Sequence, residues 1–240
     1  LNHWVGYLGR NNQTKTPNID ALAARGVWFT RSHCAAPLCN PSRAALMSGL
    51  RPSTSGVYEN GDDWRRVIPE DLPLTAAFRR GGYHVCGAGK IYHEAFRRRS
   101  EWDDYLEDAG DDPKPKGDTG VGGIRFAPLD CGDEDLREWK IVDYAAARLG
   151  EKHDKPFFLA AGLHKPHMPW NVPKKWFDLF PLDSVQLPPY QPGDLADIPP
   201  SGVKMARPQG DHKAMVESGR WKEAVQAYLA TIAYTDMNIG

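Results

Sequence analysis

The sequence predicts a layered α/β fold. Helix signals and strand signals alternate along the 240 residues, which is the pattern of layered α/β proteins. Residues 157–161 form a continuous apolar run (Phe-Phe-Leu-Ala-Ala) that is typical of a buried, parallel strand. With 41% hydrophobic and 25% charged residues, the composition indicates a globular protein with a core rather than a disordered chain.

Three helices are expected in the first third of the chain. Thr16 supplies an N-cap and Pro17 a first-turn proline, so a helix is predicted over residues 18–25, and Gly26 ends it. The same signals predict further helices over residues 41–48 and 73–80.

Two further strands are predicted before the apolar run. Residues 27–30 (Val-Trp-Phe-Thr) have the composition of a short strand. Residues 83–86 are also β-prone, and they lead into an expected glycine-rich turn at residues 87–89.

The second half of the chain should contain two longer helices. Residues 133–149 have acidic residues early, a basic residue late and apolar residues at helical spacing. Residues 221–237 are expected to form the last helix. Residues 103–123 and 187–208 are long connections, which in compact domains are usually functional rims or mobile flaps. No internal repeat and no domain boundary is evident.

The net charge of −1 gives no global electrostatic reason to bind nucleic acid or an anionic membrane. No apolar run is long enough to span a bilayer. Residues 1–4 lack the basic and apolar regions of a secretion signal, and the chain does not begin with Met. Targeting signals therefore do not reveal the compartment.

Four cysteines are too few for a disulfide framework, and none forms the paired Cys-x-x-Cys of a structural zinc site. Cys34, Cys86 and Cys131 are expected to be mostly buried thiols, with at most one disulfide. Cys39 stands in a different context.

Cys39 begins the run Cys-Asn-Pro-Ser-Arg, which continues to Gly49. Because Pro41 is expected in the first helical turn, Cys39 should lie just before a helix N-terminus, where free N–H groups and the positive dipole end favour an anion. Arg43, one turn further, can direct a fixed charge to the same place. A buried cysteine beside an ordinary helix cap is the alternative.

This run resembles the signature of the sulfatase family, Cys-x-Pro-Ser-Arg followed by a Ser/Thr-Gly pair. In that family a separate maturation enzyme oxidises the cysteine to Cα-formylglycine. The resemblance implies that Cys39 is the modified residue and, as formylglycine, one ligand of a metal ion. It also implies that Pro41 and Arg43 belong to the recognition sequence, and that Arg43 is a partner of the formylglycine.

Residues 82–93 (Gly-Tyr-His-Val-Cys-Gly-Ala-Gly-Lys-Ile-Tyr-His) form a second motif. A phosphate-binding loop is excluded, because it needs Gly where His84 stands and Ser or Thr where Ile91 stands. The segment resembles the second sulfatase signature, which implies that Lys90 contacts the sulfate and the formylglycine hydroxyl, with His93 nearby. Standing alone, it would indicate a solvated lysine and a surface histidine.

A third motif, His-Lys-Pro-His-x-Pro at residues 164–169, comes after the apolar run, where α/β proteins place ligand chemistry. Its side chains can supply protons and positive charge, although a surface histidine is the plainer interpretation. The motif is similar to that of the iduronate-2-sulfatase subgroup, which implies that His167 faces the ester oxygen and the sulfate, and that Lys165 lies in the substrate pocket. Trp64 and Arg65 also resemble that subgroup and are rim candidates.

The resemblance further implies a divalent cation, usually Ca²⁺, held by oxygen ligands. In the family these come from an Asp-Asp pair after the first strand and an Asp-His or Asp-Asn pair near the C-terminus. Residues 1–4 resemble the family's segment directly after the first pair, Gly240 precedes the second, and Asp20 and Asp236 are not at ligand positions. We therefore expect the remaining ligands outside this chain, and little Ca²⁺ binding or turnover by these 240 residues alone.

The implied fold is alkaline-phosphatase-like: a mainly parallel sheet sandwiched by helices, incomplete at both ends, with the site at its C-terminal edge. Residues 1–240 are expected to be part of an N-terminal catalytic domain without an internal boundary. The implied activity is that of a sulfuric ester hydrolase acting on sulfated sugars or polysaccharides. One hydroxyl of the hydrated aldehyde would attack sulfur and the other would later expel sulfate, whereas a serine would stay trapped as its sulfate ester. Arg43 and Lys90 would add fixed charge, and His167 would donate the proton.

Two rival functions stay open: a phosphodiesterase or phosphonate hydrolase of the same superfamily, and a non-catalytic glycan-binding relative. The implied partners are a sulfated carbohydrate substrate and the formylglycine-generating maturation enzyme, and no nucleic acid is expected. Because the family is commonly exported, the resemblance implies a periplasmic or extracellular location.

Overall fold

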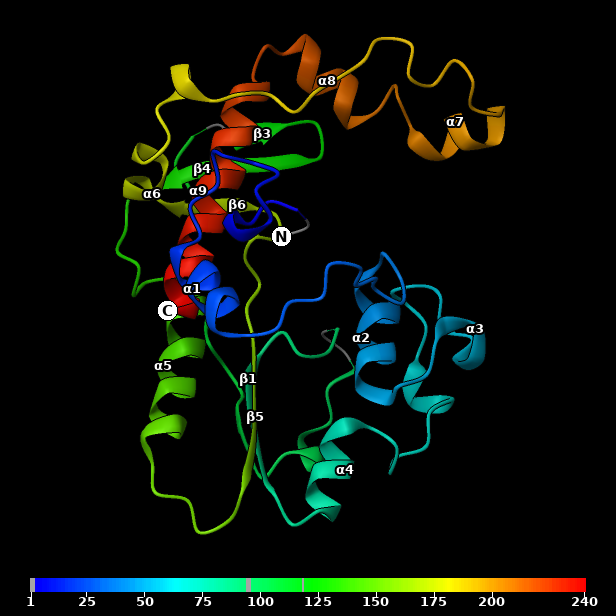
Figure 1. Cartoon of the computed structure of the whole chain (residues 1–240), viewed down its shortest axis with the longest axis vertical. Helices are drawn as coiled ribbons and strands as arrows, with labels where there is room; N and C mark the ends of the chain where they lie inside the picture. The colour runs from blue at the N-terminus through cyan, green and yellow to red at the C-terminus, as the bar shows by residue number, and fades with distance from the viewer. Residues whose placement is uncertain (1–2, 94–95, 118) are drawn as a thin grey trace. The chain divides into compact units, whose positions relative to one another are not determined.

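A computed structural model of the chain describes residues 3–93, 96–117 and 119–240 (Figure 1). The chain forms two compact units, each assembled from segments that are distant in the sequence. Unit 1 comprises Leu1–Val27, Asp111–Leu136 and Lys165–Gly240, and unit 2 comprises Trp28–Gly110 and Arg137–His164. Each unit has its own sheet and core, and each is described by itself.

Unit 2 contains a parallel sheet in the order β2-β1-β5. The central strand β1 (His84–Gly89) pairs with β2 (Asp104–Leu106) and with β5 (Phe157–Gly162), and β1 and β5 run side by side in Figure 1. The parallel orientation expected of the apolar run is confirmed. Because all three strands point the same way, their carboxyl ends meet at one edge of the sheet.

The α-helices that the described residues of this unit form are α2 (Cys39–Ser48), α3 (Pro52–Ser55), α4 (Leu74–Arg80) and α5 (Arg137–Gly150). The 3₁₀ turns η2 (Trp64–Arg66) and η4 (Arg99–Glu101) lie in the connections. Helices α4 and α5 contact β1, and α5 also contacts β5. The buried core is made by Ala44, Met47, Val57, Trp64, Ile68, Val85, Ile91, Tyr92, Trp102 and Tyr105.

The sheet of unit 1 is mixed. Strand β4 (Ile124–Leu129) pairs antiparallel with β3 (Gly120–Val121) and parallel with β6 (Trp170–Pro173). The long helix α9 (Trp221–Ile239) packs on β4 and β6, as Figure 1 shows, and its apolar residues are buried along most of its length. The other elements are η1 (Gly6–Leu8), α1 (Pro17–Arg25), α6 (Lys174–Asp178), η5 (Leu182–Ser184), α7 (Pro200–Ala206) and α8 (Asp211–Glu217).

Helix α1 is capped from α9 rather than by its own N-cap side chain. The buried carboxylate of Asp236 accepts hydrogen bonds from the backbone N–H of Asn18 (3.0 Å) and of Ile19 (2.8 Å), and from the Asn18 side chain (3.1 Å). The Thr16 hydroxyl instead accepts the Gly6 N–H at 2.7 Å. The helix was predicted correctly, but the expected Thr16 side-chain cap was wrong, because a long-range carboxylate satisfies the free N–H groups.

The strand predicted over residues 27–30 is not formed. Val27 and Phe29 are 86% and 80% exposed, and no strand in the described parts of the chain pairs with this segment. A β-prone composition makes a strand only where a neighbouring strand supplies hydrogen bonds and packing.

The glycine-rich turn predicted at residues 87–89 was also wrong, because β1 continues through to Gly89. A Cβ at Gly87 would collide with the Trp102 ring, and one at Gly89 would collide with the backbone of Gly162. These glycines therefore allow close packing within and upon the sheet. Gly89 also has a φ of +75°, which suits the end of the strand.

Several predicted boundaries shift. Helix α5 begins at Arg137 instead of residue 133, because the Asp133 carboxylate accepts hydrogen bonds from Lys175 (2.6 Å) and Trp176 (2.7 Å) in unit 1. Strand β5 is mostly half-buried rather than buried, since it lies at an edge of the described sheet. The two long connections are irregular but contain β2, β3 and α7.

No helix within the described residues is long and apolar enough to cross a membrane. Leu1 and Asn2, two of the four residues in which no secretion signal was found, lie outside the described residues. Asp118, in the first long connection, lies outside them as well. The single partial catalytic domain over residues 1–240 stays a prediction.

Candidate functional site

Cys39 is the first residue of helix α2, so the helix begins two residues earlier than expected. The preceding Leu38 has extended backbone, and its carbonyl accepts the Ser42 N–H at 3.1 Å. Cys39 is half-buried and lines a cavity of about 470 Å³ together with Cys34, Ala36, Pro37, Leu38, Ser42, Arg43 and Leu46. The thiol is therefore reachable at a helix N-terminus, where anions are favoured.

Asn40 is a structural residue of this site that no sequence motif indicated. Its buried side chain donates hydrogen bonds to the carbonyls of Glu59 (3.0 Å) and Asp62 (2.8 Å), and its N–H donates to Asn60 Oδ1 (2.9 Å). Backbone N–H groups of Glu59 and Tyr58 in turn lower the pKa of Asp62. Asn40 thus ties the start of α2 to this loop, and no pattern in the sequence signals such a long-range contact.

Arg43 connects the first two sequence motifs. One guanidinium nitrogen donates to the carbonyl of Lys90 and, at 3.1 Å, to the carbonyl of Ile91. Burial lowers the pKa of Arg43, and the neighbouring Cys39 partly offsets that effect. Within unit 2, therefore, Cys39, Arg43 and the backbone of Lys90 come together.

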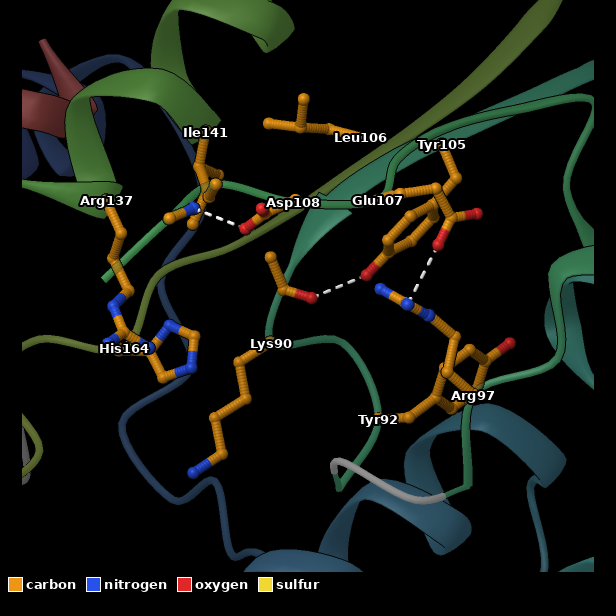
Figure 2. A pocket seen from close by; sticks show the side chains of 13 residues that line it. Lys90, Tyr92, Arg97, Tyr105, Leu106, Glu107, Asp108, Arg137, Ile141 and His164 are labelled. Carbon is orange, nitrogen blue, oxygen red and sulfur yellow. Dashed lines mark hydrogen bonds and ion pairs between the residues drawn. The ribbon is translucent and has the colours of Figure 1, made fainter.

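Lys90 directly follows β1, and its N–H donates to the Gly162 carbonyl at 2.7 Å. It lines a cavity of about 210 Å³ at the carboxyl ends of the strands. Figure 2 shows Lys90 between His164 and Tyr92, with its side chain extending away from Tyr105. The other lining residues are Gly89, Arg97, Leu106, Glu107, Asp108, Ala109, Gly110, Arg137 and Ile141.

His93 lies three residues after Lys90 and is half-buried. Its carbonyl accepts the Phe96 N–H at 2.9 Å, and its ring lies 6.4 Å from the Phe96 ring, centroid to centroid. Between the two candidates, Tyr92 is buried in the core of unit 2. One short segment therefore carries both Lys90 and His93.

Lys165 and His167 belong to unit 1. The Lys165 ammonium is buried, where it donates to the Pro169 carbonyl (2.9 Å) and lies 3.4 Å from the Asp112 carboxylate. His167 is exposed, and its Nδ1 lies 2.6 Å from the Met168 carbonyl. Because a carbonyl oxygen can only accept, Nδ1 carries the hydrogen and Nε2 is left for other chemistry.

The six candidate residues thus fall into two groups, Cys39 with Arg43, Lys90 and His93 in unit 2, and Lys165 with His167 in unit 1. Each group is defined within its own unit. The joint arrangement of the two groups stays a prediction.

Trp64 and Arg65 were expected at the rim, and that expectation was wrong. Trp64 is only 1% exposed, and the Arg65 guanidinium is stacked 3.8 Å from the centre of its ring. Arg65 is also paired with the buried carboxylate of Glu101. Both residues belong to the interior of unit 2, because aromatic stacking and ion pairing compensate for the burial of the guanidinium.

The donor set for the implied cation is not assembled by the described residues, which hold no cluster of three or more His, Cys, Asp or Glu side chains suited to a metal. Asp236 caps α1, and Asp20 accepts the Tyr7 N–H and the Thr16 hydroxyl. These carboxylates have structural partners and do not fit the cation. We therefore derive no step through a metal.

All four cysteines are free thiols. The expectation of burial holds for Cys86, Cys131 is half-buried, and Cys34 is exposed, so the expectation was wrong there. Cys34 lies in an irregular stretch before α2, where no helix or strand of its own orders the chain.

Alkylation with iodoacetamide at mildly alkaline pH is expected to label Cys34 early and Cys86 last. Burial, and next the nearby Asp104, raise the pKa of Cys86, so little reactive thiolate forms there. Peptide mass spectrometry over a time course measures the order. Unfolding in guanidinium should abolish the difference, and rapid native labelling of Cys86 would contradict its burial.

Comparisons with known proteins agree with the sequence motifs. The family model described as Sulfatase matches residues 3–240. A curated sulfatase of Formosa agariphila is 36% identical, over 100% of this chain and 52% of the relative. The mouse iduronate 2-sulfatase is 28% identical, over 94% of this chain and 46% of the relative.

A likeness to solved structures confirms the predicted alkaline-phosphatase-like α/β fold. The phosphonate monoester hydrolase of Agrobacterium radiobacter superposes with a TM-score of 0.74 at 20% identity, covering 99% of this chain and 55% of that one. The chain spans about half the length of the curated relatives above. Since the family model covers nearly the whole chain, the chain belongs to the sulfatase family.

Proposed function

We propose that the full-length protein hydrolyses sulfate esters of sugars, and that this chain supplies the nucleophile and part of the positive charge. The observation that carries the proposal is the contact of Arg43 with the Lys90 and Ile91 carbonyls. It joins the Cys-Asn-Pro-Ser-Arg run to the backbone of the Gly-Lys motif, and so supports the proposal that both motifs serve one site.

Cys39 is suited to conversion into formylglycine. It is half-buried at the mouth of an open cavity, and the recognition residues Pro41 and Arg43 follow it in α2. The hydrated aldehyde would supply a hydroxyl nucleophile and a second hydroxyl through which sulfate can later leave. The proposed partner for this conversion is the formylglycine-generating maturation enzyme.

The charges of the site suit sulfate transfer. Arg43 and Lys90 would hold the negative charge that develops on the outer oxygens of sulfur, and such fixed cations are among the strongest contributions to catalysis. His167 is the proposed proton donor to the leaving alcohol, because its Nδ1 is anchored and its Nε2 can carry the transferred proton. His93 would assist beside Lys90.

Lys165 is the proposed substrate-binding residue of unit 1. Its ammonium is paired with Asp112 and with the Pro169 carbonyl, so a substrate anion would have to compete with that carboxylate. The proposed Ca²⁺ would be bound in part by Cys39 in its formylglycine form.

Sulfated sugars are the proposed substrate class because the mouse relative is named an iduronate 2-sulfatase. Phosphonate hydrolysis is less supported, since the likeness to that enzyme is one of fold at 20% identity. We also propose a periplasmic or extracellular location, as is common in the family.

Mass spectrometry of the tryptic peptide of residues 32–43, from full-length protein co-expressed with a maturation enzyme, should reveal the modification. Conversion of Cys39 replaces a thiol by an aldehyde, so the peptide loses one sulfur and two hydrogens and gains one oxygen. Cys34 in the same peptide serves as the internal control and should stay a thiol. An unmodified Cys39 would favour the non-catalytic glycan-binding alternative.

The matured full-length protein should hydrolyse an aryl sulfate faster than the matching aryl phosphonate ester. The expected preference in kcat/KM is roughly a hundred-fold or more, because an enzyme binds the transition state of its own reaction more tightly than that of another. Stopped assays of both esters under identical conditions measure it. A preference for the phosphonate would overturn the sulfatase proposal.

A further inference from the structure

The segment of residues 90–93 must be held in place if Lys90 and His93 are to act on one substrate. Arg43 holds the Lys90 and Ile91 carbonyls. A second set of contacts holds the same segment through Tyr92. No sequence motif predicted these contacts.

Tyr92 is anchored by a buried carboxylate. Its hydroxyl donates to Glu101 Oε2 at 2.5 Å, and both residues are buried in unit 2. Desolvation, and next the hydrogen bond with Glu101, raise the pKa of Tyr92. Because a free tyrosine already titrates well above neutral pH, this shift keeps the phenol protonated, and so a hydrogen-bond donor, near neutral pH.

Glu101 is in turn clamped by Arg65. The guanidinium donates to both carboxylate oxygens, including Oε2 at 3.0 Å, and its Nε donates to the Phe96 carbonyl at 2.8 Å. The two side chains are each 8% exposed. A two-pronged pair of this kind fixes orientation as well as distance.

Aromatic rings enclose the pair. The Arg65 guanidinium lies 3.8 Å from the Trp64 ring centre and 4.8 Å from the Tyr92 ring centre. Trp102 meets the Tyr92 ring edge to face at 6.1 Å. The rotamers of Tyr92 and Arg65 are therefore set by rigid neighbours, which is what a precise support requires.

Burying an ion pair costs desolvation free energy, and apolar side chains of the same size often give a core of equal or greater stability. Stability alone thus gives a weak reason for this arrangement. Glu101 accepts a hydrogen bond from Tyr92, which stands between Lys90 and His93 in the sequence. Arg65 donates one to the carbonyl of Phe96, three residues after His93.

We propose that Arg65, Glu101 and Tyr92 are positioning residues, which fix the segment of residues 90–93 so that Lys90 and His93 are presented in register to the sulfate. Arg43 and this triad hold the segment through different atoms. The inference rests on the proposed function for its kinetic consequence, but its structural consequence can be measured without a substrate.

Tyr92→Phe in the matured full-length protein is the sharpest test, because it removes one hydroxyl and keeps the ring. We expect kcat for an aryl sulfate to fall roughly ten- to a hundred-fold, since small misplacements of reacting groups cost about that much. KM should change less than about threefold, because the substrate contacts remain.

Tyr144→Phe is a matched control. The Tyr144 hydroxyl donates to Asp104 at 2.9 Å, and Arg148 pairs with Asp104 at 3.3 Å while stacking on Tyr144. This second triad has the same chemistry, but its hydrogen bond and ion pair join α5 to β2 instead of reaching residues 90–93. We expect Tyr144→Phe to leave kcat within about twofold of the parent.

A double-mutant cycle separates positioning from a loss of folded protein. If Tyr92 acts through Lys90, then Tyr92→Phe should have little further effect on kcat in a Lys90→Ala background. The inference is overturned if Tyr92→Phe leaves kcat unchanged, or if its effect persists fully in that background.

Amide hydrogen exchange tests the positioning of residues 90–93 without any measurement of turnover. Tyr92→Phe should speed exchange at residues 90–93 while leaving β5 unchanged, and Tyr144→Phe should not. Unaltered exchange at residues 90–93 would refute the triad even in an active enzyme. If the matured parent hydrolyses no aryl sulfate, the proposed function fails, and the exchange result still decides the positioning.

Discussion

Cys39→Ser in the full-length protein should lower the turnover of an aryl sulfate by about a thousand-fold or more, because loss of a nucleophile removes most of the catalysis in enzymes of this kind. Serine could still attack sulfur once. It has no second hydroxyl from which to expel sulfate, so the enzyme would remain as a stable sulfate ester. Steady-state rates and intact-protein mass spectrometry measure both consequences.

Cys131→Ser is the control for this substitution. Cys131 is half-buried in unit 1, and burial, followed by the nearby Asp135, raises its pKa, so it should contribute no reactive thiolate. Its replacement should leave turnover close to that of the parent. Full turnover by Cys39→Ser would end the formylglycine proposal.

Asp236→Ala should lower the free energy of unfolding by about 3 kcal/mol, because it leaves the N-terminus of α1 without its acceptor. Asp236 is 1% exposed and accepts hydrogen bonds from the Asn18 N–H, the Asn18 side chain and the Ile19 N–H. These bonds also join α1 to α9, which are far apart in the sequence. Urea denaturation of parent and variant measures the loss.

Asp178→Ala is the matched control for the loss of a carboxylate. Asp178 pairs with Lys174 at 2.5 Å within α6, but both side chains are more than half exposed. Such surface pairs contribute about 0.5 kcal/mol or less. Equal losses from the two substitutions would show that Asp236 is not the anchor of α1.

Local patterns predicted much of the fold. Proline and glycine positions located α1, α2 and α4, because these residues restrict the backbone wherever they stand. The apolar run of residues 157–161 predicted a parallel strand, and β5 pairs parallel with β1. Helix α9 was also expected, over residues 221–237, and it extends two residues further, to Ile239.

The errors came from interactions between distant residues. The β-prone residues 27–30 find no strand partner among the described residues, and Gly87 allows an approach by Trp102 rather than a turn. Trp64 and Arg65 were predicted to lie at the rim. The prediction failed because Glu101 neutralises the Arg65 guanidinium, and a partner 36 positions away cannot be identified from local sequence. Composition indicates which side chains can be buried. Whether they are buried depends on interaction partners that lie far away in the sequence.

The motifs picked out the residues of the candidate site, and the roles of these residues stay predictions. In unit 2, Arg43 interacts with Cys39 and donates a hydrogen bond to the backbone carbonyl of Lys90. The pairing of Lys165 with Asp112 and the role of Asn40 could not be predicted. Both depend on long loops, whose paths follow from tertiary contacts rather than from local preference.

The two facing glycines at the ends of β1 and β5 have a consequence for the chemistry. A methyl group on Gly162 would occupy the space of the Lys90 carbonyl carbon and the Ile91 nitrogen, and one on Gly89 would meet the Gly162 carbonyl. The backbone can therefore follow this path at the ends of the two strands only if both positions are glycine. The Lys90 and Ile91 carbonyls that Arg43 contacts are therefore placed by a backbone path that requires glycine at both positions.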